Sequence, residues 1–316
     1  MLLLVAVVWG SSYLAAKTAT QALPVLVVLF ARYALSALAC LVLVALRGRC
    51  TRDELRAGAL LGVTQAAVLV LETYGVAKTS AANAGLIISL TIVLTPLLDR
   101  MVGPDSGRLP ARFYAATGVC LLAVALLMGG NGFHAPGTGD LLMLAAAVVR
   151  AVHVVLVGRL TKGRAVRPLQ LTAVQMVVGS ALFAVPAASG LPTLTHLGPP
   201  AWGQLLYLAL FCSVFAFLAQ TWAVQRSSAS RASLLLGTEP VWAVAAGIGL
   251  GGEKFTVLAG LGATLMVAGT YWGQHIERAH RTADNEEPSS STVVRRHRVH
   301  PAPVAAEADH PGHHLR

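Results

Sequence analysis

Residues 72–86 read ETYGVAKTSAANAGL, and residues 220–234, 148 positions further along, read QTWAVQRSSASRASL. Six of the fifteen aligned positions are identical, and the pairs Glu/Gln, Tyr/Trp, Lys/Arg and Thr/Ser occupy four more. The chain therefore contains an internal repeat, and the direction in which each copy runs decides the fold.

The composition places the chain in a membrane. It has 316 residues, of which 55% are hydrophobic and 12% are charged, and its mean hydropathy is +0.66. That is more apolar surface than a soluble domain of this length can bury. Apolar windows close to the length that crosses about 30 Å of hydrocarbon occur ten times. We expect an all-α integral membrane protein with ten transmembrane helices, at residues 2–19, 24–46, 57–77, 80–101, 112–129, 139–158, 169–188, 202–224, 229–251 and 255–273.

The basic residues give the orientation of these spans. With the N-terminus inside, the cytoplasmic loops hold 13 Lys and Arg residues and the outer loops hold 3, before the basic tail is counted. Because basic loops stay on the cytoplasmic side, we expect both termini to be cytoplasmic and the protein to lie in the cytoplasmic (plasma) membrane. The net charge of +10 is mostly this topology signal, so no nucleic-acid partner is expected.

The two copies of the repeat lie five predicted helices apart, and five is odd. The second copy therefore crosses the membrane in the opposite sense to the first. We expect two inverted five-helix repeats, at residues 1–130 and 139–275, followed by a disordered cytoplasmic tail at 276–316. Inverted repeats recur in secondary transporters, in which two similar halves open a central site to either side in turn. A duplication that only doubled a helical bundle is the open alternative.

Four ionisable residues inside the predicted spans are candidates for function: Arg32, Glu72, Arg150 and Glu239. An ionisable group in hydrocarbon is costly unless it meets a partner or a water-filled cavity. Two cations and two anions sum to zero, which favours pairing across the bundle, and Arg32, Glu72 and Glu239 are the candidates for ion-pair or ion-coupling roles. Glu239 precedes Pro240 near the middle of the predicted span, where a proline removes a backbone donor and opens the helix.

Six residues are candidates for contact with a solute: Trp9, Ser12, Tyr13, Arg150, His153 and Glu239. The first three place an aromatic wall and hydroxyl groups near the bilayer midplane. Arg150 and His153 are three residues apart and share a helix face, and an arginine in the cavity favours an anionic group such as a carboxylate or phosphate. Structural roles stay open, namely a packing tryptophan, serines bonded to their own helix and a spacer histidine. The four cysteines have no metal-type spacing, so neither a metal site nor a cofactor is expected.

Several stretches resemble the EamA family of the drug/metabolite transporter superfamily. They are WGSSYLAAK at 9–17, ARYALSALACLVLVAL at 31–46, TSAANAGLIISLTIVLTPLL at 79–98 and SRASLLLGTEPVWAVAAGIGLGGEKFTVLAGLGATLMVAG at 230–269. The resemblance covers residues 1 to about 275 and implies ten helices, cytoplasmic termini, two five-helix repeats and carriage of small metabolites, commonly export. The first copy departs from the pattern, because it has DRMVGPDSGRL where the second has Gly252 and Glu253.

The sequence therefore predicts a secondary transporter that moves a small metabolite by alternating access, with export as the expected direction. Nothing resembles a nucleotide-binding Walker A loop, so a proton or the solute's own gradient is the expected driving force, and no enzyme activity is expected. The expected partners are a small-molecule solute, the lipid bilayer and, as an open question, a second copy of the chain in a homodimer. The alternatives are a membrane-embedded enzyme of the lipid-phosphate type and a scaffold that transports nothing.

Overall fold

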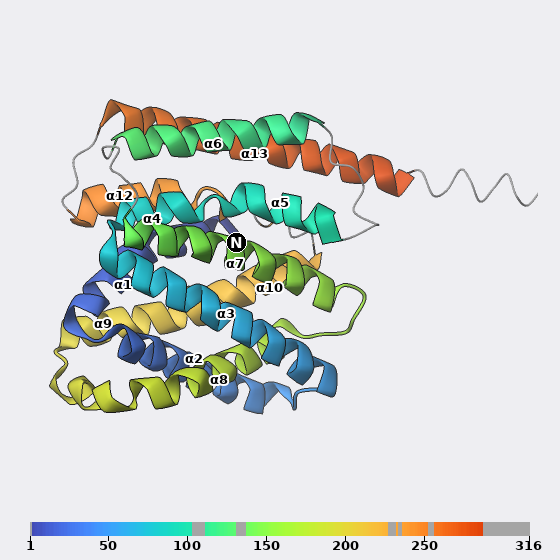
Figure 1. Ribbon diagram of the computed structural model, residues 1–316. Coiled ribbons are helices and arrows are strands. Elements are labelled where there is room, and N and C mark those ends of the chain that lie inside the picture. Colours follow the sequence, from blue (N-terminus) through green and yellow to red (C-terminus); the bar gives the residue numbers. More distant parts are fainter. Residues whose placement is uncertain are drawn as a thin grey trace, which may run out of the picture. The chain divides into compact units, whose positions relative to one another are not determined.

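The computed structural model describes residues 2–102, 111–130, 137–226, 232, 236–251 and 256–286, and the regular elements there are helices. The chain forms two compact units, residues 1–277 and 278–316. Figure 1 shows the elements in chain order: α1 (Leu2–Ala22), α2 (Val25–Arg47), α3 (Arg52–Lys78), α4 (Ala81–Ile88), α5 (Thr91–Val102), α6 (Ala111–Gly130), α7 (Thr138–Thr161), α8 (Pro168–Ala187), η1 (Ala188–His196), α9 (Pro199–Leu206), η2 (Tyr207–Phe215), α10 (Ala216–Arg226), α12 (Glu239–Gly251) and α13 (Val257–Glu286).

The helices are long and apolar, as a multi-pass membrane protein requires. Among the described residues, seven helical segments could cross a membrane: Leu2–Ala22, Val25–Arg47, Arg52–Lys78, Ala81–Asp99, Thr138–Thr161, Pro168–His196 and Pro199–Arg226. Two shorter apolar helices, Ala111–Ala123 and Glu239–Leu250, fall on the predicted spans 112–129 and 229–251. The chain is thus an all-helical, multi-pass membrane protein in the part that the structure describes.

The last helix is longer than the sequence predicts. α13 begins at Val257, within the predicted span 255–273, and continues to Glu286. Residues 276–286 of the expected disordered tail are therefore helical. The remainder of that tail, residues 287–316, lies outside the described residues.

Local sequence explains where the helices begin. The Thr51 side chain accepts a hydrogen bond of 3.2 Å from the Glu54 amide, while the Glu54 carboxylate accepts one of 2.7 Å from the Thr51 amide. This capping box satisfies two backbone donors at the start of α3. Ser80 caps α4 in the same way, accepting from the Asn83 amide at 3.0 Å. α8 begins with Pro168, whose missing N–H costs nothing in the first helical turn.

The predicted span 80–101 is broken, and so is the segment before α12. A turn at 89–90 separates α4 from α5, and a turn at 237–238 precedes α12. These turns lie 148 residues apart, which is the spacing of the sequence repeat. The expected position of Glu239 near the middle of a helix is wrong, because Glu239 is the first residue of α12. Pro240 follows within the first turn, where it breaks no helical hydrogen bond.

The predicted span 202–224 contains a π-helix, η2, between α9 and α10. Its wider turns release backbone carbonyls to donors on other helices. The Trp9 indole of α1 donates to the Cys212 carbonyl at 2.9 Å, and the Ser36 hydroxyl of α2 donates to the Ala209 carbonyl at 3.0 Å. Within η2, the Ser213 hydroxyl donates to the Leu208 carbonyl at 3.0 Å. Side-chain hydrogen bonds therefore attach η2 to both α1 and α2.

Helices from the two halves of the chain interleave throughout residues 1–277. The most extensive packing joins α2 to α8 and α3 to α7, and α3 also packs on α8 (Figure 1). α1 packs on α12, while α7 packs on α4 and α5; α2 packs on η2 and α9. α3 approaches α8 closely at Gly58 and Gly62, since a Cβ there would lie 2.6 Å from the Val174 Cβ and 2.8 Å from the Val178 Cβ of α8.

Candidate functional site

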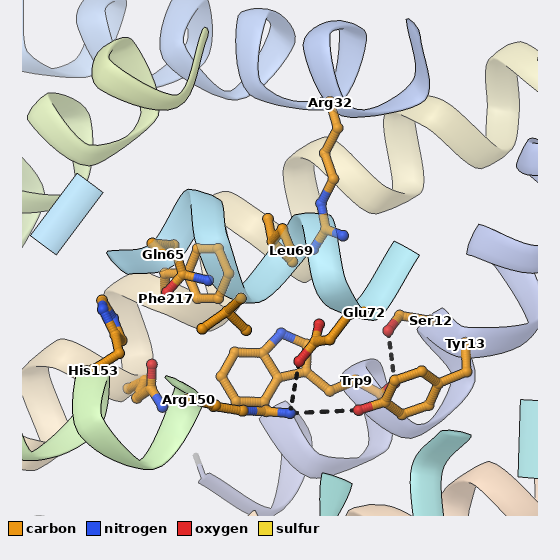
Figure 2. Close-up of a pocket in the computed structure, with 12 residues that line it drawn as sticks. Trp9, Ser12, Tyr13, Arg32, Gln65, Leu69, Glu72, Arg150, His153 and Phe217 are labelled. Carbon is orange, nitrogen blue, oxygen red and sulfur yellow. Dashed lines mark hydrogen bonds and ion pairs between the residues drawn. The ribbon is translucent and has the colours of Figure 1, made fainter. Parts of the chain in front are cut away.

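A small cavity lies where five helices meet. It measures about 20 Å³, taken as the space open to the centre of a water molecule. The lining comes from α1, α2, α3, α7 and α10, so both halves of the chain contribute (Figure 2). The lining residues are Trp9, Ser12, Tyr13, Arg32, Gln65, Val68, Leu69, Glu72, Arg150, His153, Phe217 and Gln220.

Arg150 is the centre of a buried polar network. Its guanidinium makes two contacts with the Glu239 carboxylate, Nη2 to Oε2 at 3.1 Å and Nη1 to Oε1 at 3.3 Å. Nη1 also lies 3.4 Å from Glu72 Oε1 and 3.4 Å from the Tyr13 hydroxyl. The Tyr13 hydroxyl in turn donates to Glu239 Oε1. One cation therefore joins two carboxylates that come from different halves of the chain.

Trp9 forms the aromatic wall of this network. The Arg150 guanidinium carbon lies 4.3 Å from the centre of the indole ring, which is a cation–π contact. Phe217 extends this wall, since its ring centre is 5.6 Å from that of Trp9 and the two rings are tilted by 57°. The indole N–H is held by the Cys212 carbonyl at 2.9 Å, so the ring is fixed in place. Trp9 thus both lines the cavity and anchors η2.

Arg32 enters the cavity from α2, on the opposite side of Glu72 from Arg150 in the view of Figure 2. Only 6% of Arg32 is exposed, and its Nε donates to the Ser213 hydroxyl of η2 at 2.7 Å. It forms no ion pair within 4.0 Å with any described residue. Of the four charges predicted to pair, Arg150 therefore pairs with both glutamates. Arg32 instead donates a hydrogen bond to a serine hydroxyl.

The other predicted residues lie close by. His153 lines the cavity, and its Nδ1 is 2.8 Å from the Thr64 hydroxyl of α3. The Ser12 hydroxyl donates to the Trp9 carbonyl of its own helix at 2.7 Å, which is the structural role left open for it. Seven of the eight residues predicted for binding or pairing line the cavity. The eighth, Glu239, is hydrogen-bonded to two lining residues, Tyr13 and Arg150.

Outside those eight residues, the lining also contains Gln65, Val68, Leu69, Phe217 and Gln220. Gln65 was detectable, because residues 65, 69 and 72 share one face of a helix and the last of them is Glu72. Phe217 carried no signal, since an aromatic residue in an apolar span is ordinary. Among the described residues, no three His, Cys, Asp or Glu side chains are grouped as a metal site.

Two polar clusters lie at the opposite ends of α3, which runs past the cavity at its middle. At the first end, Glu54 is fully buried and its carboxylate accepts from the Arg167 amide at 3.0 Å and from the Arg167 guanidinium at 2.9 and 3.0 Å. These hydrogen bonds to Glu54 raise the pKa of Arg167 above its ordinary value. At the second end, Lys17 donates to the Thr79 carbonyl at 2.8 Å, and the Thr79 hydroxyl donates to Asp140 at 2.6 Å. Both clusters join the first half of the chain to the second.

Comparison with known proteins agrees with this architecture. The model of the EamA-like transporter family matches residues 1–129 and 137–272. An uncharacterized transporter of Archaeoglobus fulgidus is 26% identical over 270 residues, which cover 84% of this chain and 82% of that protein. The uncharacterized inner membrane transporter YedA of Escherichia coli K12 is 24% identical over 277 residues, covering 83% of this chain and 85% of YedA.

The uncharacterized transporter YyaM of Bacillus subtilis is 28% identical over 200 residues, covering 62% of this chain and 65% of YyaM, just under two thirds of that protein. A known crystal structure superposes with a TM-score of 0.71 at 19% identity, covering 88% of this chain and 96% of its own, and so shares the fold. The family match takes in both copies of the repeat and every described residue that lines the cavity. The chain belongs to the EamA-like transporter family.

Proposed function

We propose that the protein is a secondary transporter that carries a small metabolite across the cytoplasmic membrane by alternating access, in the export direction. The observation that carries this proposal is the cavity between the halves, lined by buried charges of both signs midway along α3. Charged groups inside membrane spans are costly and mark pathways for solutes or ions. The solute-binding residues are Trp9, Ser12, Tyr13, Arg150, His153 and Glu239, with Arg32 and Glu72 completing the charged set.

An inverted repeat is supported by the pattern of breaks and contacts. The turns at 89–90 and 237–238 lie at equivalent positions of the two copies. The packing of α1 on α12 corresponds to that of α7 on α4 and α5, and the packing of α3 on α8 corresponds to that of α2 on η2 and α9. Contacts that recur with the halves exchanged are what a two-fold axis in the membrane plane produces.

The clusters at the ends of α3 fit the two gates that alternating access needs. A water molecule requires roughly 10–15 Å³ of such space, so the cavity of about 20 Å³ has room for little more than one. A metabolite enters only when the halves separate on one side. With both termini cytoplasmic, the cluster of Glu54 and Arg167 faces the cytoplasm, and the cluster of Lys17, Thr79 and Asp140 faces outward.

Flux into proteoliposomes tests the proposal. The purified protein is reconstituted, and uptake of a metabolite library is measured with and without an imposed pH gradient. Accumulation that depends on the protein, and that saturates, supports transport, and its response to the pH gradient distinguishes a proton from the solute's own gradient as the driving force. Absence of protein-dependent flux for every solute refutes the proposal.

Two further measurements test the arrangement. Reporter fusions after Lys78 and after Arg226 are expected on opposite sides of the membrane, and the same side for both would exclude the inverted repeat. The homodimer stays a prediction, which the mass of the purified protein in nanodiscs tests directly.

A further inference from the structure

Two loops at one end of the bundle carry an excess of positive charge. The basic patch consists of the seven basic residues of segments 47–56 and 162–167, namely Arg47, Arg49, Arg52, Arg56, Lys162, Arg164 and Arg167. Six of them are exposed, and the side chain of the seventh, Arg167, is 43% exposed. The same segments contain two acidic residues, Asp53 and the buried Glu54, so seven cations against two anions leave an excess of five.

The fold joins the two segments into one surface. The Arg167 Nη2 donates to the Arg49 carbonyl oxygen at 2.6 Å, and the same guanidinium binds the Glu54 carboxylate. The late part of α3 packs on the early part of α7, since a Cβ at Gly75 would lie 2.7 Å from the Met143 Sδ. The end of α7 therefore lies beside the start of α3. The preference of basic loops for the cytoplasm explains the charge of each segment, but it does not explain the contact between them.

Arg167 keeps one edge of its guanidinium unused. Its Nε and Nη2 groups donate to Glu54 and to the Arg49 carbonyl, whereas Nη1 donates to no described residue. A Cβ at Gly48 would lie 3.8 Å from Nη1, so this edge lies beside the α2–α3 loop. Arg49 takes part through its backbone carbonyl, and its exposed side chain forms no ion pair with a described residue. Two guanidinium groups, one from each half, thus have N–H donors available at this junction.

An exposed apolar surface adjoins these cations. One exposed face of α3 carries, in chain order, Arg52, Arg56, Leu60 and Val63. Spacings of four, four and three residues place them one after another along the helix. Leu60 is 49% exposed and Val63 is 51% exposed, and Leu46 in the last turn of α2 is 80% exposed. Cations at the helix end and apolar side chains nearer its middle match a phospholipid, in which a charged phosphate is followed by acyl chains.

We propose that the basic patch binds an anionic phospholipid, whose phosphate contacts the Arg49 guanidinium and Nη1 of Arg167 and whose acyl chains lie on the exposed apolar residues of α2 and α3. Arginine suits phosphate oxygens in geometry and charge, and basic clusters at a membrane surface attract anionic headgroups. Because the two arginines come from different halves, the lipid binds while the segments are joined and favours closure at this end of the bundle. Lipid binding at this site does not depend on what the protein transports.

Lipid selectivity tests this proposal. Binding to the detergent-solubilised protein is followed by native mass spectrometry, with phosphatidylglycerol and with phosphatidylcholine of the same acyl chains. A cation near the membrane surface contributes about fivefold to the affinity for an anionic lipid, so contact with two arginines predicts that phosphatidylglycerol binds about tenfold more tightly, or better. Salt screens this attraction, so the difference is expected to shrink as the ionic strength rises. Glycerol 3-phosphate, which has no acyl chains, is expected not to displace the lipid at equal concentration.

Single substitutions locate the site. Arg49→Gln is expected to weaken phosphatidylglycerol binding about fivefold. Its melting temperature is expected to stay unchanged, because the hydrogen bond from Arg167 uses the Arg49 backbone. Arg49→Lys keeps the charge and is expected to retain most of the affinity. Arg112→Gln is the matched control, since it removes an exposed arginine at another predicted cytoplasmic loop, on α6, which packs on α4 and α5.

Equal affinity for the two lipids overturns the proposal, and so does a loss in Arg112→Gln as large as the loss in Arg49→Gln. Displacement of the lipid by glycerol 3-phosphate at equal concentration would show a site for a soluble anion and would overturn the proposal as well. If Arg49→Gln does not fold, the ranking of the two lipids on the unmodified protein decides alone. Flux does not enter this test, so the lipid site and the proposed function stand or fall separately.

Discussion

Replacing Arg150 by methionine is the most direct test of the buried network. The change keeps an apolar stem of similar length but removes the cation shared by Glu72 and Glu239. Removing one partner of a buried ion pair typically costs about 3–5 kcal/mol, because a charge is left uncompensated. Protonation sets an upper limit on this loss of stability, because a protonated carboxyl no longer carries an uncompensated charge. Adding a proton at pH 7 to a carboxyl with an ordinary pKa of about 4.3 costs about 3.7 kcal/mol. We therefore expect a destabilisation of about 3–4 kcal/mol at pH 7.

The same reasoning predicts how this defect changes with pH. At pH 5 protonation costs only about 1 kcal/mol, so lowering the pH restores stability to the variant relative to the unmodified protein. The free energy of unfolding is measured in mixed micelles by titration with a denaturing detergent at both pH values. Arg226→Met is the matched control, because Arg226 also stacks on a tryptophan, at 4.7 Å, but forms no ion pair with a described residue. Equal losses for the two variants, independent of pH, would refute the reasoning.

Three further predictions concern the site and the packing around it. Glu239→Gln is expected to abolish flux, or to uncouple it from the pH gradient, with normal membrane insertion; unchanged pH-dependent flux would remove Glu239 from the site. Arg167→Gln leaves the buried Glu54 carboxylate without its guanidinium donors, so we expect a lower melting temperature, whereas Arg164→Gln melts as the unmodified protein does. Gly10→Ala places a Cβ 2.6 Å from the Trp242 Cβ and 2.7 Å from the Glu239 carbonyl oxygen. Overpacking costs about 1–3 kcal/mol, so this variant should lose stability by that amount, and Gly203→Ala, with nothing within 4 Å of its Cβ, should not.

The ionisable residues that stand out in the apolar spans lie together in the structure, at the cavity or hydrogen-bonded to its lining. Arg32, Glu72, Arg150 and Glu239 were found because a charge in an apolar span is conspicuous, and pairing follows from its cost. The partners themselves could not be predicted. Arg150 takes both carboxylates and Arg32 takes a serine hydroxyl because of how α2, α3, α7 and α12 are placed around one another. That placement depends on side-chain packing between helices far apart in the sequence.

Local backbone was harder to predict than helix content. A hydropathy window averages over a span, so it reports neither the turn at 89–90 nor the start of α12 at Glu239. Pro240 was assigned to the interior of a helix because the apolar run continues on its N-terminal side. The turn at 237–238 makes it a first-turn proline instead. The π-helix depends on donors from α1 and α2, which no local pattern contains.

The π-helix also makes the two copies of the repeat unequal in length. The segment Arg52–Lys78 has 27 residues, whereas its counterpart Pro199–Arg226 has 28. A π turn holds about one residue more than an α turn, so the wider turns of η2 make this segment shorter along its axis than an α-helix with the same number of residues. Deleting one residue between Tyr207 and Phe215 would regularise this helix, but it would withdraw the acceptor that holds the Trp9 ring.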